Sequence, residues 1–167
     1  LALAALEANE ANIAYELIEK ESIGILAGKD SCLANRVPSG TPIHLEEAEK
    51  ESFVSLDASH SSRIIQDRLF RRYNIHPHIL LETTSLEVAR RVALKGGACM
   101  VLPDVYADDF VFDSGGAFYP LKDYENHRHF YACYRNDENT KKYIRDFVSI
   151  TTSVLAQSTH GRRLVSK

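Results

Sequence analysis

Two short clusters rich in serine and threonine each follow an apolar segment of the chain. Asp57, Ala58, Ser59, His60, Ser61 and Ser62 follow residues 53–56, and Thr83, Thr84 and Ser85 follow residues 78–81. Serine and threonine oxygens accept the free backbone N–H groups of a first helical turn, so both clusters are typical of helix N-termini. Unpaired N–H groups and the helix dipole also attract anions to such positions. The clusters are therefore candidate ligand contacts.

The residue pattern does not favour a catalytic or metal site. Ser59 and His60 are adjacent, but a serine nucleophile needs a third group and an oxyanion hole, and no G-x-S-x-G elbow is present. Two histidine pairs alternate along extended segments: His76 with His78, and His127 with His129. Neither pair has a nearby Cys, Asp or Glu that completes a recognisable zinc set. We expect no catalytic residue, no metal and no cofactor.

The elements around the second cluster predict how it is positioned. Residues 78–81 are predicted as a buried strand, and Thr84 and Glu87 have capping-box spacing for the helix that follows. Gly96 and Gly97 end that helix, and residues 98–102 form a second buried strand. Because these glycines close a helix rather than open one, they are no dinucleotide-binding fingerprint. Strand, helix and strand form a βαβ unit, which indicates a parallel sheet.

The same geometry is predicted twice. Residues 53–56 form another apolar strand, and a helix over residues 62–73 follows the first cluster. If the two strands are parallel neighbours, both clusters lie at the same edge of the sheet. Most helix caps bind nothing, but two helix N-termini at one edge favour a pocket for a carboxylate or similar small anion. Arg63, Arg68, Arg71 and Arg72 are predicted on the solvated face of this helix.

Composition limits the possible functions. The 167 residues suffice for one domain with a core, and 44% hydrophobic and 26% charged residues are ordinary values for a globular protein. A net charge of -3 argues against a nucleic-acid-binding surface. Three widely spaced cysteines indicate free thiols in a reducing cytoplasm, and no apolar run approaches the ~20 residues of a membrane helix. The chain begins without methionine, and we expect it to be part of a longer protein.

The ends of the chain predict further elements. Residues 13–18 alternate as a strand does, and residues 23–27 form another strand. A long helix begins near residues 136–139, and Gln157 begins a tail that we expect to be frayed. The helix has one apolar face, formed by Tyr143, Phe147, Ile150 and Val154.

Together these pieces resemble the effector-binding domain of LysR-type transcriptional regulators, which has the type 2 periplasmic-binding-protein fold. The matching segments are residues 21–27, 41–47 before 53–55, 73–77, 82–87, 96–103 and 129–154. Ala98 stands where the family usually has a second glycine, and residues 2–5 resemble the family's D-L-A-I strand without its Asp. The winged helix-turn-helix, the linker helix and the first half of the first subdomain have no counterpart here.

The resemblance implies an α/β fold of two subdomains joined by two hinge-crossing strands, with the first subdomain incomplete. Residues 1–21 and 129–155 would be the remnant of the first subdomain, residues 22–128 the second subdomain, and residues 156–167 a C-terminal tail. An effector would bind in the cleft between subdomains. The implied effector contacts are Ala58, Ser59, His60, Ser61, Thr83, Thr84, Ser85, Leu102 and Pro103, and the implied hinge residues are Leu26 and Ala27.

The resemblance also implies a function and partners. We expect a non-enzymatic, cytoplasmic sensory domain that binds a small anionic effector and has no membrane contact. It would form a homodimer or higher homo-oligomer through the helix over residues 85–95, and reach DNA only through a domain absent from this chain. The alternative is a solute-binding protein or small enzyme of the same fold, which the coding sequence upstream of Leu1 would distinguish.

Overall fold

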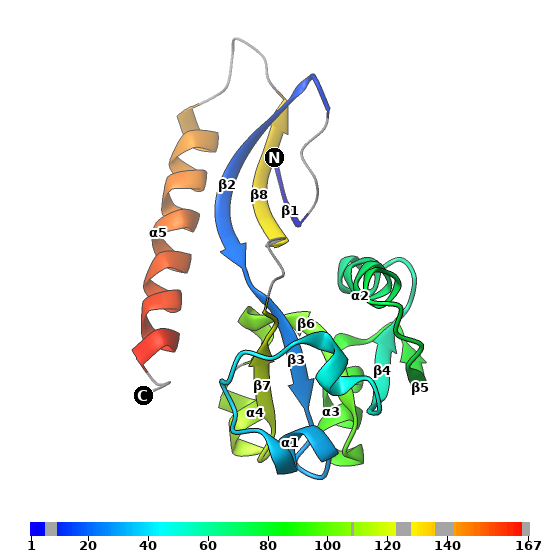
Figure 1. Ribbon diagram of the computed structural model, residues 1–167. Helices are drawn as coiled ribbons and strands as arrows, with labels where there is room; N and C mark the ends of the chain where they lie inside the picture. The colour runs from blue at the N-terminus through cyan, green and yellow to red at the C-terminus, as the bar shows by residue number, and fades with distance from the viewer. Residues whose placement is uncertain (6–9, 108, 123–127, 136–141, 165–167) are drawn as a thin grey trace. The chain divides into compact units, whose positions relative to one another are not determined.

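The computed structural model describes residues 1–5, 10–107, 109–122, 128–135 and 142–164. The chain forms two compact units. Unit 1 comprises Leu1–Glu21 with His127–Lys167, and unit 2 comprises Ser22–Asn126. Figure 1 labels the α-helices and strands of both units.

Unit 1 is a three-stranded antiparallel sheet with one helix. Its strands β1 (Ala2–Ala5), β8 (Arg128–Arg135) and β2 (Ile13–Glu21) lie in the order β1-β8-β2. The register pairs Ala2 with Cys133 on one side of β8. Helix α5 (Lys142–Leu164) packs against β2 (Figure 1).

Helix α5 differs from the prediction in two ways. It continues to Leu164, whereas a frayed tail was expected from Gln157 onwards. Each residue added to an existing helix gains a backbone hydrogen bond, and no proline interrupts this segment. Val148 is buried, but the predicted apolar face is solvent-exposed. That face consists of Tyr143, Phe147, Ile150 and Val154.

Unit 2 is built on a five-stranded mixed sheet in the order β5-β4-β6-β3-β7. The strands are β3 (Ile23–Ala27), β4 (Ser52–Leu56), β5 (His78–Thr83), β6 (Cys99–Pro103) and β7 (Ala117–Pro120). Strand β4 is parallel to both β5 and β6, as the βαβ pattern predicts, and β3 is antiparallel to β6 and β7. The helices are α1 (Cys32–Arg36), η1 (Leu45–Ala48), α2 (Ser61–Arg72), α3 (Leu86–Gly96), η2 (Asp104–Tyr106) and α4 (Asp109–Asp113).

Helices cover both faces of this sheet, so unit 2 has three layers. Ile25 of β3 points into a core that includes Leu33 of α1 and Leu69 of α2. The next residue, Leu26, points into a second core with Ala93 of α3. Strands buried on both faces are continuously apolar, which is why β3 and β6 lack an alternating pattern.

Strand β5 lies at the sheet edge, which corrects the prediction of a buried strand. Among the described strands its one neighbour is β4, and the pairing slips where Phe53 faces Ile79 while Val54 faces Leu81. Leu80 is the extra residue of this irregularity and is 49% exposed, and Ile79 is 40% exposed. An apolar run is thus left open on the sheet edge.

Gly97 ends helix α3 in the left-handed conformation, with φ at 63°, and its N–H donates to the carbonyl oxygen of Ala93. Glycine has no Cβ to oppose this conformation. The resulting turn leads the chain directly into β6.

Among the described helices, none is both long and apolar enough to cross a membrane.

Candidate functional site

The two polar clusters lie side by side at the carboxyl ends of β4 and β5. Leu56 is paired with Thr83, and the backbone N–H of Asp57 donates to the carbonyl oxygen of Thr83 over 3.1 Å. The turn formed by residues 57–61 is called turn A, and that formed by residues 83–85 is called turn B. As the sequence predicts, each turn begins at a strand end and opens a helix, α2 or α3.

Turn A is organised by Asp57 and His60. The Oδ1 atom of Asp57 accepts hydrogen bonds from the Ser59 N–H at 2.8 Å and the Ser59 hydroxyl at 2.5 Å. These bonds, the hydroxyl bond foremost, lower the pKa of the Asp57 carboxyl. His60 is the N-cap of α2, because its Nδ1 accepts the N–H of Ser62 at 3.2 Å. The predicted serine caps are therefore replaced by a histidine.

Turn B is organised by Thr83 and Ser85. The Thr83 hydroxyl accepts the N–H of Ser85 at 3.2 Å, and the Ser85 hydroxyl accepts the N–H of Val88 at 3.3 Å. Ser85 is thus the N-cap of α3, and the predicted capping box between Thr84 and Glu87 is not formed. With the cap one residue later than predicted, the Glu87 carboxylate instead pairs with the guanidinium of Arg91 at 2.5 Å.

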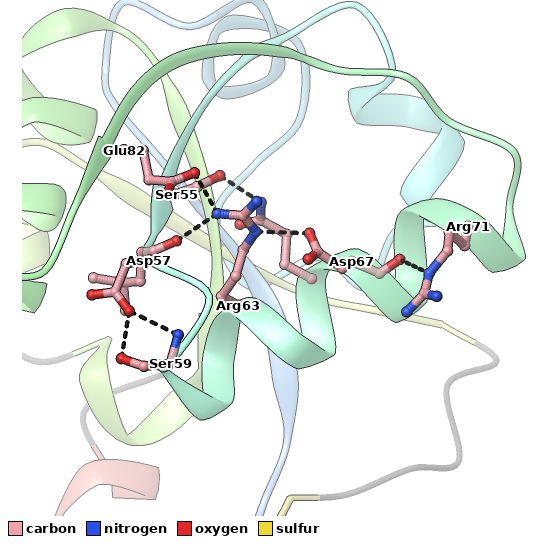
Figure 2. Close-up of polar contacts among 9 residues, drawn as sticks. Ser55, Asp57, Ser59, Arg63, Asp67, Arg71 and Glu82 are labelled. Carbon is pink, nitrogen blue, oxygen red and sulfur yellow. Dashed lines mark hydrogen bonds and ion pairs between the residues drawn. The ribbon is translucent and has the colours of Figure 1, made fainter.

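Arg63 connects the two strand residues that directly precede the turns, Leu56 and Glu82, and Figure 2 shows the polar contacts of Arg63. Its Nη1 donates to the carbonyl oxygen of Leu56 at 2.8 Å and to the Glu82 carboxylate at 2.6 Å, while its Nε donates to Asp67 at 2.8 Å. Its side chain is only 21% exposed, so it does not belong to the predicted solvated face. Hydrogen bonding to Glu82, and then to Asp67, raises the pKa of the guanidinium.

Near turn A, a buried hydrogen bond between two side chains joins α2 to β4. The Gln66 side-chain amide donates to the Ser55 hydroxyl over 2.5 Å (Figure 2), and Gln66 is only 2% exposed. Sequence reasoning missed both residues and Arg63. The available signal was a glutamine on the helical face that also carries Leu69, where an apolar residue is expected.

The other predicted site residues belong to the sheet of unit 2. Leu102 and Pro103 end β6, which runs parallel to β4 at its side, and both are buried, Leu102 in the core that also contains Leu56. Leu26 and Ala27, predicted as hinge residues, lie inside the core of unit 2, where they pair with β6 and β7. The chain passes from unit 1 to unit 2 between Glu21 and Ser22, before β3 begins.

The described site is suited to binding a polar ligand. Ala58, Ser59 and Thr84 are exposed, whereas His60, Ser61, Thr83 and Ser85 are half-buried. Hydroxyl groups and two helix N-termini therefore meet at one edge of the sheet. Within the part of the chain that the structure describes, no group of three or more His, Cys, Asp or Glu side chains could hold a metal ion.

The model of the LysR substrate binding domain family matches residues 1–156 of this sequence. The chain belongs to this family. Members of this family are regulatory domains of transcription factors, and the α/β architecture is the type 2 periplasmic-binding-protein-like fold of the family. No curated protein matches the sequence.

Solved structures of LysR regulators share this fold. The regulatory domain of CcmR from Synechocystis PCC6803, in complex with 2-PG, matches with a TM-score of 0.75 and 16% identity over 91% of this chain and 71% of that one. The effector-binding domain of QuiR, in complex with shikimate, matches with a TM-score of 0.72 and 14% identity over 91% of this chain and 69% of that one. The effector-binding domain of BenM, with its effector benzoate, matches with a TM-score of 0.70 and 16% identity over 95% of this chain and 69% of that one. The chain covers 51% of full-length BenM.

Proposed function

We propose that this LysR substrate-binding domain senses a small anionic effector at turns A and B and controls a DNA-binding domain of its parent regulator. The supporting observation is that two helices begin side by side where parallel strands β4 and β5 end. Unpaired backbone N–H groups at such positions favour an anion. The carboxylates in the complexes of QuiR and BenM are consistent with this ligand class.

The acidic side chains near the turns have partners within the protein. Asp57 already accepts two hydrogen bonds from Ser59, and Glu82 is bound to the guanidinium of Arg63. The ligand anion would instead be held by backbone N–H groups and by hydroxyls, chiefly those of Ser61, Thr84 and Ser85. Effector binding would shift the conformational equilibrium of the regulator, and with it the affinity for DNA in the cytoplasm.

Two variants of turn B test the effector site in the intact parent. Thr84→Leu introduces bulk at an exposed position, and Ser85→Asp keeps a good N-cap while adding a negative charge. We expect both to abolish the effector response. Benzoate, shikimate and 2-PG are the first probes, with binding followed by NMR and response by a reporter gene. Ser153→Asp, at an exposed serine of α5, is the matched control and should respond normally. Unchanged induction in both turn B variants would remove these residues from the site.

We also propose that the regulator self-associates through α3. Val88 near the start of this helix is 45% exposed, and Leu80 on the open edge strand β5 is 49% exposed and lies beside Gly96 at the end of the same helix. An edge strand offers unpaired backbone groups, and an exposed apolar surface beside it favours contact with a second copy. Val88→Glu should therefore shift the sedimentation of the intact parent towards monomer. Ile64→Glu on α2, where Ile64 is 51% exposed, is the control, and equal effects of the two changes would argue against this interface.

A further inference from the structure

Arg63 makes contacts that reach beyond its own helix. It lies in the first turn of α2, yet its Nη1 atom binds the last residue of β4, Leu56, and Glu82 near the end of β5. Its Nε atom is held from the helix side by Asp67. One guanidinium thus connects α2, β4 and β5, and the planar group of Arg is suited to such simultaneous, directed hydrogen bonds.

The bound residues stand at the roots of both turns. Leu56 directly precedes Asp57, the first residue of turn A, and Glu82 directly precedes Thr83, the first residue of turn B. Because β5 is an edge strand with an irregular register, only β4 supports it within the sheet. The Arg63–Glu82 ion pair adds a side-chain link at the end of β5 where turn B begins.

A simple surface ion pair does not account for these contacts. The pairing of Arg63 with Asp67 has i,i+4 spacing and could stabilise α2 alone. The bond to the Leu56 carbonyl, however, joins the helix to the sheet, and the low exposure of Arg63 distinguishes it from the exposed Arg68 and Arg71 of the same helix. The ion pair with Glu82 joins α2 to β5, whereas the pair with Asp67 lies within α2.

We propose that Arg63 is a positioning residue for the effector site, and this inference rests on the function proposed above. By joining the roots of turns A and B, Arg63 holds the N-termini of α2 and α3 in one fixed relation. A ligand that contacts both turns then meets a preformed site and loses less binding free energy to ordering the turns. Arg63 need not touch the ligand to have this effect.

The test measures whether each turn responds to a change at the other. Amide hydrogen exchange of Ser62 reports the cap of α2, and that of Val88 reports the cap of α3. We expect Glu82→Gln to accelerate exchange at Ser62 and Arg63→Gln to accelerate exchange at Val88, each by about fivefold, as expected for an ion pair of this exposure. Asp67→Asn removes a carboxylate from the same guanidinium without touching β5, and should leave Val88 within about twofold of wild type.

A titration with shikimate as the probe separates this inference from the proposed function. We expect Arg63→Gln to weaken shikimate binding about fivefold, and Asp67→Asn to weaken it less than about twofold. Arg63→Lys should not restore wild-type binding, because an ammonium lacks the planar fork. If each variant changes amide exchange only in its own turn, while the probe still shifts NMR signals at both turns, the positioning role alone is overturned. If amide exchange is coupled between the turns, but shikimate, benzoate and 2-PG shift no NMR signal, the effector assignment alone is overturned.

Discussion

The buried pair of Ser55 and Gln66 gives a quantitative prediction for the stability of unit 2. Ser55→Ala removes the hydroxyl that accepts the Gln66 amide, and Gln66 is too buried to bind water instead. An unsatisfied buried polar group costs about 1–3 kcal/mol of unfolding free energy. Gln66→Leu should cost a similar amount, because it leaves the fully buried Ser55 hydroxyl without its donor. The double variant should be less destabilised than the sum, since neither polar group remains.

The assay is urea denaturation followed by far-UV circular dichroism, because the chain has no tryptophan for fluorescence. In a thermal melt followed by the same signal, each kcal/mol corresponds to roughly 2–4 °C in Tm for a chain of this length, so Ser55→Ala should lower the Tm by about 2–12 °C. Ser153→Ala removes an exposed serine hydroxyl in α5 and should change the free energy of unfolding by less than about 0.5 kcal/mol.

A double-mutant cycle decides the outcome. If the costs of Ser55→Ala and Gln66→Leu simply add in the double variant, the two side chains contribute independently. The hydrogen bond would then not be the source of the stability, and the reasoning would be refuted. A coupling of about 1 kcal/mol or more supports it.

Three further predictions concern single groups. Gly97→Ala should destabilise unit 2 by about 1–2 kcal/mol in urea denaturation because of the left-handed backbone there, and Gly97→Asn by less. The lowered pKa of Asp57 favours the folded state above the ordinary carboxyl value of 3.8, and this contribution is lost as the pH falls through the lowered pKa; Ser59→Ala should raise the pKa of Asp57 in an NMR titration. Burial raises the pKa of the Cys99 thiol, so iodoacetamide should alkylate the exposed Cys32 in the folded protein and leave Cys99 unmodified until unfolding.

The sequence was sufficient to predict the parallel arrangement around β4 and β5 and the two turns at their ends. These features depend on local signals, namely apolar strands, serine and threonine at helix starts, and a glycine stop at Gly97. The edge position of β5 was not predictable in this way. An apolar run such as Ile79 to Leu81 has the same pattern in a central strand as in an edge strand, and its exposure depends on which strands pair beside it.

The polar contacts of the site show the same limit. Arg63 follows a helix start and precedes Asp67 by four residues, which is typical of a solvated helix face. Its contacts with Leu56 and Glu82 exist only once α2 has packed beside the strands. The cap of α2 by His60 was missed because the helix begins at Ser61, one residue earlier than predicted, which places His60 rather than a serine at the N-cap.

The three-stranded sheet of unit 1 imposes an order on how the chain can fold during synthesis. Strands β1 and β2 pair only through β8, and the register joins Ala2 to Cys133, so the central strand is made last. The whole of unit 2, Ser22–Asn126, is translated in between. At roughly 5–20 residues per second, β2 waits on the order of ten seconds for its partner. Unit 2 can fold as a continuous segment within that time, whereas the pairing of β1 and β2 with β8 forms only after β8 leaves the ribosome.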